Sequence, residues 1–212
     1  MKERIGEVFS IVNDNKPVAG CTISREISRG IVYYSLAANT DISAEIYPFE
    51  KWIFVLAGNL EISQPKGARY SLNKQDGIRL AKHTPAGMRT GEGTIYIEIE
   101  NKGEAMKSIE AGKIFQLAKL VPYQPQRIVN RDVFKNNTMK FVVMAFDKGT
   151  GLSDHAAPGE ALVLALEGQA VITYEGSKHT IRAGESFHFA KGGMHAVQAD
   201  DRFKMALLVT LE

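Results

Sequence analysis

Short apolar runs, rather than long amphipathic stretches, dominate the pattern of hydrophobic and polar positions along the chain. The runs are rich in Val, Ile, Phe and Tyr, and residues of the Gly, Asn, Pro and Ser type bound them at close spacing. That pattern is typical of antiparallel sandwiches and barrels. Residues 170–181 predict a tight hairpin in which Gly176 takes a positive backbone dihedral, and residues 203–211 predict a final strand. The sequence therefore predicts an all-β fold.

The chain repeats itself at a period of about half its length. Residues 31–62 align with residues 141–172, so that Pro48 matches Pro158 and Gly58 matches Gly168. A shorter pair, residues 6–12 and 112–118, aligns in the same way. Internal repetition indicates two copies of one structural unit. We place the boundary in the charged, polar stretch near residue 106, which gives domains of residues 1–105 and 106–212.

Composition and charge limit the classes of molecule that the protein is expected to bind. The 212 residues are 44% hydrophobic and carry a formal net charge of +2, without a basic stripe or an acidic tail. No nucleic-acid partner and no membrane partner is expected, and small molecules or proteins remain. The charged start and the absence of an 18-residue apolar run favour a cytoplasmic protein. A single cysteine, Cys21, excludes an intrachain disulfide and is expected to be a small packed residue.

Two motifs in the second half resemble a known family. "HAAPGEALVLALEG" (155–168) and "AGESFHFAKGGMH" (183–195) are similar to the two sequence motifs of the cupin superfamily. The resemblance covers nearly all of residues 112–212 and is weaker over residues 1–105. With the repeat, it implies a bicupin, that is, two tandem jelly-roll barrels.

The resemblance also assigns motif positions. His155 falls on the first histidine and His195 on the last, while the second histidine and the glutamate are replaced by Ala157 and Ala161. Reading residues 85–90 as the proline-glycine turn, the matching set in the first half is Glu45, Tyr47, Lys51 and Thr90. The resemblance therefore implies a partial metal or ligand site in the second barrel and a degenerate site in the first.

His155 and His195 are the candidate site residues. Side chains alternate faces along a strand, so positions 155, 157 and 161 are expected to face the barrel interior together. Imidazole suits Zn, Fe, Ni and Cu, and Mn stays among the divalent metals considered. A complete site needs at least a third protein donor, for which Glu160 and His188 are the candidates. The two alanines leave space for a small-molecule ligand between the histidines.

Two interpretations of this pocket stay open. In the first, His155 and His195 hold a divalent metal, and the protein is an enzyme acting on a small polar or carbonyl-bearing metabolite. The resemblance implies dioxygenases, sugar isomerases, epimerases or decarboxylases, without choosing among them. In the second, the histidines only form hydrogen bonds to a metabolite, without metal and without turnover. Glu45 and Lys51 are expected to pair or to lie at the rim of the first barrel, which we interpret as a scaffold or interface. Whether two chains form a homodimer is left open.

Overall fold

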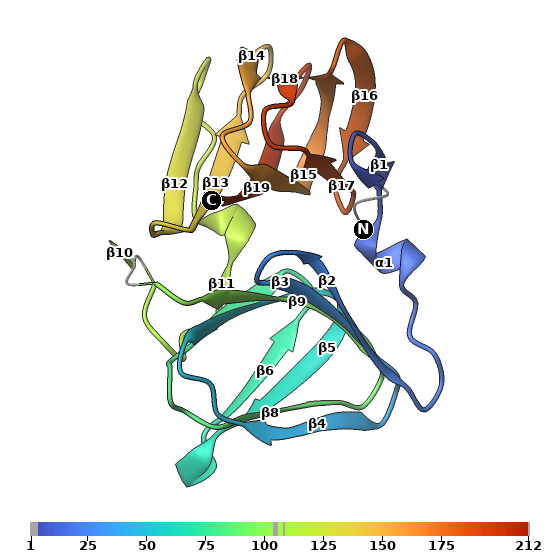
Figure 1. Ribbon diagram of the computed structural model, residues 1–212, viewed down its shortest axis with the longest axis vertical. Coiled ribbons are helices and arrows are strands. Elements are labelled where there is room, and N and C mark those ends of the chain that lie inside the picture. The colour runs from blue at the N-terminus through green and yellow to red at the C-terminus, as the bar shows by residue number, and fades with distance from the viewer. Residues whose placement is uncertain (1–3, 104–105, 108, 212) are drawn as a thin grey trace. The chain divides into compact units, whose positions relative to one another are not determined.

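The computed structural model describes residues 4–103, 106–107 and 109–211, and nearly all of its regular structure is β-strand (Figure 1). Contacts divide these residues into two compact units. One contains residues 12–103 and 109–116, which we call the N-terminal barrel. The other contains residues 4–11, 106–107 and 117–211, which we call the C-terminal barrel. Among the described residues, no helix is long and apolar enough to cross a membrane.

The N-terminal barrel is built on one long strand, β5, that takes part in two sheets. The first sheet has the order β11-β7-β5-β9-β3-β2, and β6 and β8 pair with the far end of β5 while β4 pairs with β8. Its strands are β2 (Thr22–Ser28), β3 (Ile31–Leu36), β4 (Thr40–Glu45), β5 (Glu50–Ser63), β6 (Arg69–Asn73), β7 (Asp76–Leu80), β8 (Ala86–Thr90), β9 (Thr94–Asn101) and β11 (Phe115–Gln116).

The C-terminal barrel repeats this plan around β15. Its first sheet has the order β1-β17-β15-β19-β13-β12-β10, and β16 and β18 pair with the far end of β15 while β14 pairs with β18. Its strands are β1 (Val8–Phe9), β10 (Met106–Lys107), β12 (Ile128–Lys135), β13 (Met139–Phe146), β14 (Gly151–Ala156), β15 (Glu160–Tyr174), β16 (Ser177–Arg182), β17 (Ser186–Phe189), β18 (Met194–Gln198) and β19 (Phe203–Thr210). In both barrels together, the described residues also form the short helices α1 (Ile11–Asp14), η2 (Pro65–Gly67) and η3 (Leu117–Lys119).

The predicted all-β fold is confirmed, and the pairing registers of the two barrels match residue by residue. Ile53 lies opposite Glu98 in the first barrel, as Val163 lies opposite Leu207 in the second. The central strands of both barrels carry a register shift at the same place, one before Ala57 and the other before Glu167. The repeat seen in the sequence is therefore a repeat of strand order and of register.

The first strand of each copy is exchanged. β1 pairs with β17 in the C-terminal barrel, and its counterpart β11 pairs with β7 in the N-terminal barrel. Each barrel thus obtains an edge strand from the segment that precedes the other copy in the chain. The division at residue 105/106 stays a prediction for the folding domains, because the two units of the structure do not follow the chain in one piece each.

Each barrel encloses an apolar core. Alternate residues of the long strands face it: Ala161, Val163 and Ala165 from β15 in one barrel, and Ile53 and Val55 from β5 in the other. Burial of such side chains is the main favourable contribution to folding.

Two local predictions have opposite outcomes. The hairpin between β15 and β16 has a two-residue turn in which Glu175 and Gly176 both have positive φ, so the predicted turn is confirmed. Cys21, expected to be packed, is an exposed free thiol, and that prediction is wrong. Cys21 immediately precedes β2, an edge strand whose first five residues are exposed, so this position has no second layer to pack against.

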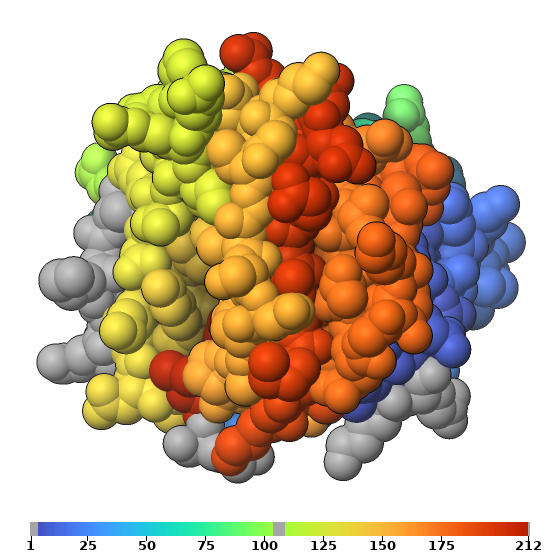
Figure 2. Space-filling model, turned by 90° about the horizontal axis from the view of Figure 1, so that it is seen from above, coloured from blue at the N-terminus to red at the C-terminus, as the bar shows by residue number. Residues whose placement is uncertain are grey.

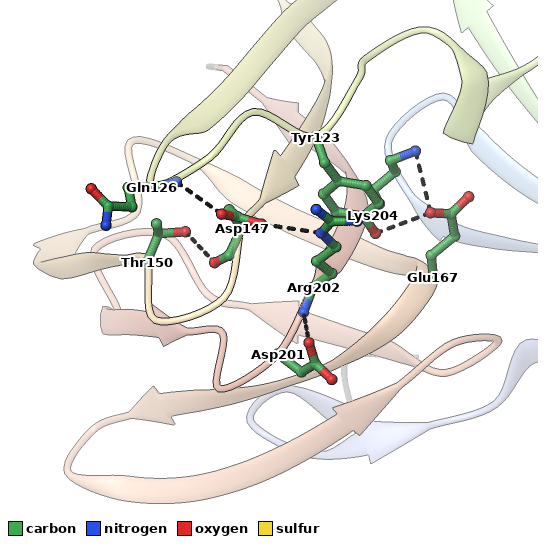
Figure 3. A network of polar contacts seen from close by, with 8 residues as sticks. All are labelled: Tyr123, Gln126, Asp147, Thr150, Glu167, Asp201, Arg202 and Lys204. Carbon is green, nitrogen blue, oxygen red and sulfur yellow. Dashed lines mark hydrogen bonds and ion pairs between the residues drawn. The ribbon is translucent and has the colours of Figure 1, made fainter.

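A polar network fixes the segment that leads into β12 on the C-terminal barrel (Figure 3). The ammonium of Lys204 donates to the carbonyl of Ala118 at 2.8 Å and lies 3.2 Å from the carboxylate of Glu167. The hydroxyl of Tyr123 donates to the same carboxylate at 3.0 Å, and burial with this bond raises the pKa of Tyr123. Since Lys204 is buried, these contacts satisfy its charge, and the network is a structural one.

Candidate functional site

The structure brings His155 and His195 together. β14 and β18 are antiparallel, and a register shift after Leu152 leaves the two histidines directly opposite each other. Their ring centroids are 4.2 Å apart. Figure 2 looks onto the sheet that carries them, in which β14 (gold) lies beside β18 (red), and the far end of β15 and then β16 follow in orange. Two residues 40 positions apart in the chain therefore form one cross-strand pair.

Backbone hydrogen bonds determine which ring nitrogen of each histidine carries the proton. Nδ1 of His155 lies 2.8 Å from the carbonyl oxygen of Ser153, and Nδ1 of His195 lies 3.0 Å from that of Gly193. A carbonyl oxygen only accepts, so Nδ1 must donate in both rings. In the neutral rings, Nε2 is then the unprotonated nitrogen, able to accept a hydrogen bond or bind a metal.

The two imidazoles differ in environment. His195 is buried, and its ring stacks on Phe189 with centroids 4.1 Å apart. Burial lowers the pKa of His195, and the nearby His155 adds to that effect. His155 is exposed. The pair therefore has a neutral ring at its base, in contact with the apolar core, and a second ring open to solvent.

The two alanines of the first motif do not line an open pocket next to the histidine pair. Ala157 and Ala161 are both buried and belong to the apolar core, together with side chains such as Phe187 and Met205. Ala157 also exchanges backbone hydrogen bonds with Gly192 and Gly193, which closes the turn before β18. The structure thus shows these two positions as packing residues, and the expected pocket between them and the histidines remains a prediction.

The N-terminal barrel holds the more strongly charged cluster. The ammonium of Lys51 lies 2.7 Å from the Glu98 carboxylate, and both side chains are buried. The same ammonium lies 3.5 Å from the centre of the Tyr47 ring. The hydroxyl of Tyr47 donates to the carboxylate of Glu45, which is exposed. Lys51 therefore pairs with Glu98, not with Glu45, and Glu98 is a residue that the motif comparison missed.

Thr90 does not belong to this cluster. In β8 the residue opposite Glu45 is Ala86, just as His195 is opposite His155. Thr90 lies at the other end of β8, where its hydroxyl accepts from the backbone amide of Gly93. The assignment of Thr90 to the position of His195 is thus wrong by four residues. Leu80 and Phe189 end the preceding strands at matching positions, and five residues follow each of them in both halves, so Ala86 is the match of His195 and the proline-glycine turn read from residues 85–90 is not the turn before β8.

Comparison with known proteins identifies the fold family. Residues 142–211 match the family described as Cupin domain (Cupin_2). A cupin 2 conserved barrel domain protein from Leptotrichia buccalis superposes with a TM-score of 0.87 at 24% identity, over 97% of this chain and 97% of that one. Residues 142–211 therefore match a cupin domain, and the chain as a whole has the fold of that barrel protein. A search of curated proteins found no match.

Two enzymes share the bicupin fold at lower similarity. The salicylate 1,2-dioxygenase from Pseudoaminobacter salicylatoxidans has a TM-score of 0.64 at 11% identity, over 87% of this chain and 72% of that one. An oxalate decarboxylase from Bacillus subtilis has a TM-score of 0.57 at 12% identity, over 98% and 77%. At these identities the likeness concerns the fold, and the chemistry must be argued from the residues of this chain.

The donors present do not make up a protein metal centre of the kind expected of a cupin. The candidate third donors, Glu160 and His188, lie 3.9 Å from each other. His188 pairs with Leu162, between Phe187 and Phe189, whose side chains face the core. Since neighbours on a strand point to opposite faces, His188 lies on the face of the sheet away from His195. In the part of the chain that the structure describes, no three His, Cys, Asp or Glu side chains are grouped to hold a metal.

The buried ring of His188 is expected to make the stability of the protein depend on pH. Its ring is fully buried, and neither nitrogen has a hydrogen-bond partner among the described residues. Burial lowers the pKa of His188, although the Glu160 carboxylate opposes this effect. The unfolded chain then binds more protons than the folded one as the pH falls below about 6.5, the usual histidine pKa. We expect the free energy of unfolding to decrease between pH 7.5 and pH 5.5.

Urea unfolding at a series of pH values measures this effect in wild type and in His188→Leu. The variant should show a shallower loss of stability toward low pH, because it lacks the buried imidazole. His83→Asn, which removes an exposed histidine at a positive φ that asparagine tolerates, is the matched control. An equal slope in wild type and His188→Leu would contradict the explanation.

Proposed function

We propose that this bicupin binds a small polar metabolite at the His155–His195 pair of the C-terminal barrel, without a resident metal. The observation that carries the proposal is the pair of hydrogen bonds from Nδ1 to the carbonyls of Ser153 and Gly193. They leave two Nε2 atoms as acceptors on rings that are 4.2 Å apart. A ligand that brings hydroxyl protons to both nitrogens matches this arrangement.

Protonation decides which functional group fits. A neutral imidazole that already donates through Nδ1 can only accept at Nε2, so it recognises a hydroxyl but not a carbonyl. Because burial lowers the pKa of His195, its ring is neutral at pH 7. Recognition of a carbonyl oxygen requires the protonated ring and is therefore favoured only at low pH. Of a hydroxyl and a carbonyl group, the hydroxyl is therefore the better match.

A second candidate function is a divalent metal-dependent enzyme that acts on a small polar or carbonyl-bearing metabolite. One observation favours it: histidines that bind metals usually donate the other ring N–H to a backbone carbonyl, as both do here. His155 and His195 would contribute two imidazole ligands, and Zn, Fe, Ni or Mn would supply Lewis-acid or redox chemistry when bound. The remaining ligands would have to come from water or substrate.

Metal analysis separates the two functions. We expect protein purified without added metal to contain less than one equivalent, and Zn²⁺ titration to give no tight complex that depends on His195. The variants are His155→Ala and His195→Ala, with His179→Ala as a control that removes a histidine from the neighbouring hairpin. A stoichiometric metal that is lost in both site variants and retained in His179→Ala would establish the metalloenzyme instead.

Nitrogen NMR of the imidazole rings tests the binding proposal itself. At pH 7.5 the ¹⁵N shifts of His155 and His195 should report the tautomer protonated at Nδ1, and titration with glycerol should move their Nε2 signals. Protonated Nε2 in either ring at pH 7.5, or no response of these signals to glycerol, would rule the proposal out.

A further inference from the structure

The interior of the N-terminal barrel contains an ion pair that its core does not explain. Lys51 and Glu98 lie on the inward faces of β5 and β9, next to core residues Ile53 and Tyr96. Their side chains are 10% and 5% exposed, and 2.7 Å separates the ammonium nitrogen from the carboxylate oxygen. Burial raises the pKa of Glu98 above its usual value, and the attraction of Lys51 offsets only part of this rise. Removing two charges from water carries a large desolvation cost, which their mutual attraction only partly offsets.

The second barrel shows that the fold does not require these charges. The register places Ala161 at the position of Lys51 and Leu207 at that of Glu98. Tyr34 and Tyr96 face each other where the second barrel has Met144 and Met205. One chain therefore builds the same strand positions twice, once with apolar side chains and once with a charged and hydroxyl-bearing cluster. A role in folding alone does not account for the difference.

Polar groups of the cluster have unused hydrogen-bonding capacity. The hydroxyl of Tyr96 is fully buried and has no hydrogen-bond partner among the described residues. Its ring stacks on Tyr34 with centroids 5.0 Å apart. Desolvation, followed by the nearby Glu98, raises the pKa of Tyr34 to about 12, so this hydroxyl stays protonated. The ammonium of Lys51 has three N–H donors, and its contact with the Glu98 carboxylate needs only one of them.

A cavity lies beside the ammonium-bearing side chain of Lys51. It measures about 20 Å³ and is lined by Lys51 and by Tyr47, Phe49, Leu80, Met88 and the exposed Glu45. This volume holds about one water-sized group. The rings of Tyr47 and Phe49, with centroids 5.3 Å apart, lie at its wall and offer aromatic surface to a carbon skeleton. One oxygen atom of a ligand can therefore enter while the rest of the ligand remains at the mouth.

We propose that the N-terminal barrel has a ligand site of its own, in which Lys51, held by its ion pair with Glu98, binds one hydroxyl group of a small uncharged alcohol. A hydroxyl accepts from the ammonium of Lys51 and can donate to the carboxylate of Glu45, and both of these side chains line the cavity. Lys51 and Glu98 balance each other's charge, and the carboxylate of Glu45 also lines the cavity, so the site carries a net negative charge. That charge disfavours carboxylate and phosphate ligands. This proposal does not depend on the function of His155 and His195.

The test uses propane-1,2-diol and its anionic counterpart, lactate. The methyl group of Met88 lines the cavity, so NMR of methionine-methyl-labelled protein reports occupancy, with Met88→Leu to assign the signal. We expect the diol to shift the Met88 signal saturably, and lactate to bind at least about tenfold more weakly because of the carboxylates. The methyl signals of Met144 and Met205, in the other barrel, should not move.

The deciding variant is Lys51→Ala/Glu98→Leu, which installs the residues of the second barrel. It should fold, as shown by a dispersed Met88 methyl signal without ligand and a cooperative urea unfolding transition, and lose the response of Met88 to the diol. Lys140→Ala, which removes a lysine from an exposed pair with Asp132, should retain the response. The proposal is overturned if wild type shows no saturable shift, if lactate binds as tightly as the diol, or if the double variant still responds.

Discussion

Replacing Lys51 with alanine is expected to lower the free energy of unfolding by about 3–5 kcal/mol, because it leaves the Glu98 carboxylate buried without its cation. Glu98 is 4% exposed, so water cannot substitute for the ammonium at 2.7 Å. The variant also removes the cation that lies over the Tyr47 ring. At low pH the loss should become smaller, since protonation of Glu98 removes the unpaired charge, and burial already raises the pKa of this carboxyl.

The double variant Lys51→Ala/Glu98→Leu should recover most of that loss. The second barrel carries Ala161 and Leu207 at these positions, and replacing a buried ion pair with packed apolar residues is often neutral or stabilising. Urea unfolding of wild type, both single variants and the double variant forms a complete thermodynamic cycle. Additive losses in the double variant would show that the pair is not desolvated as the structure indicates.

The repeat is the part of the structure that the sequence predicts best. The alignment of residues 31–62 with 141–172 anticipates two barrels of the same register, because strand spacing and the glycines at fixed positions are local features. The exchange of β1 and β11 could not be predicted in this way. The alignment of the two segments is the same whichever barrel each of them joins. Which barrel a segment joins depends on chain connections far from the strand itself.

The proximity of His155 and His195 follows from the motif spacing, but their surroundings do not. A sequence gives the residues of a strand that share a face, and only the packed structure shows the face that is turned inward. The segment 95–100 alternates apolar residues with Tyr96, Glu98 and Glu100, which is the pattern of a strand with a polar outer face. In the structure Tyr96 and Glu98 face the core of their barrel, and the isoleucines between them are buried as well.

The same limit applies to the candidate third donors. Glu160 and His188 are candidates because they lie near the motif positions in the chain, whereas one residue along a strand reverses the direction of a side chain. The structure places them beside each other, with His188 on the face away from His195. A donor set inferred from spacing therefore needs the pairing register before it can be counted as a metal site.

Gly168→Ala is expected to destabilise the C-terminal barrel by roughly 2–5 kcal/mol, the sum of a left-handed backbone conformation and overpacking. Gly168 has φ of +70°, and a Cβ there would lie 1.9 Å from the carbonyl oxygen of Arg202. Gly58, the matching residue of the first barrel, approaches the carbonyl of Gly93 in the same way, with 2.0 Å between that oxygen and the place of a Cβ. In each barrel the motif glycine thus allows the long central strand to pass close to the backbone just before the adjacent strand, β9 or β19. A residue with a side chain would clash there.

Gly176→Ala separates the two contributions, since Gly176 has φ of +78° and, apart from its two neighbours in the chain, no residue has an atom within 4 Å of the place that a Cβ would take. It should lose only the backbone part, about 1–2 kcal/mol. Chemical unfolding followed through the methyl signals of Met144 and Met205 assigns the loss to the barrel concerned, because both side chains belong to its core. Equal losses in Gly168→Ala and Gly176→Ala would mean that the strand relaxes away from the Arg202 carbonyl. The close approach would then not be what requires glycine at the end of the first motif.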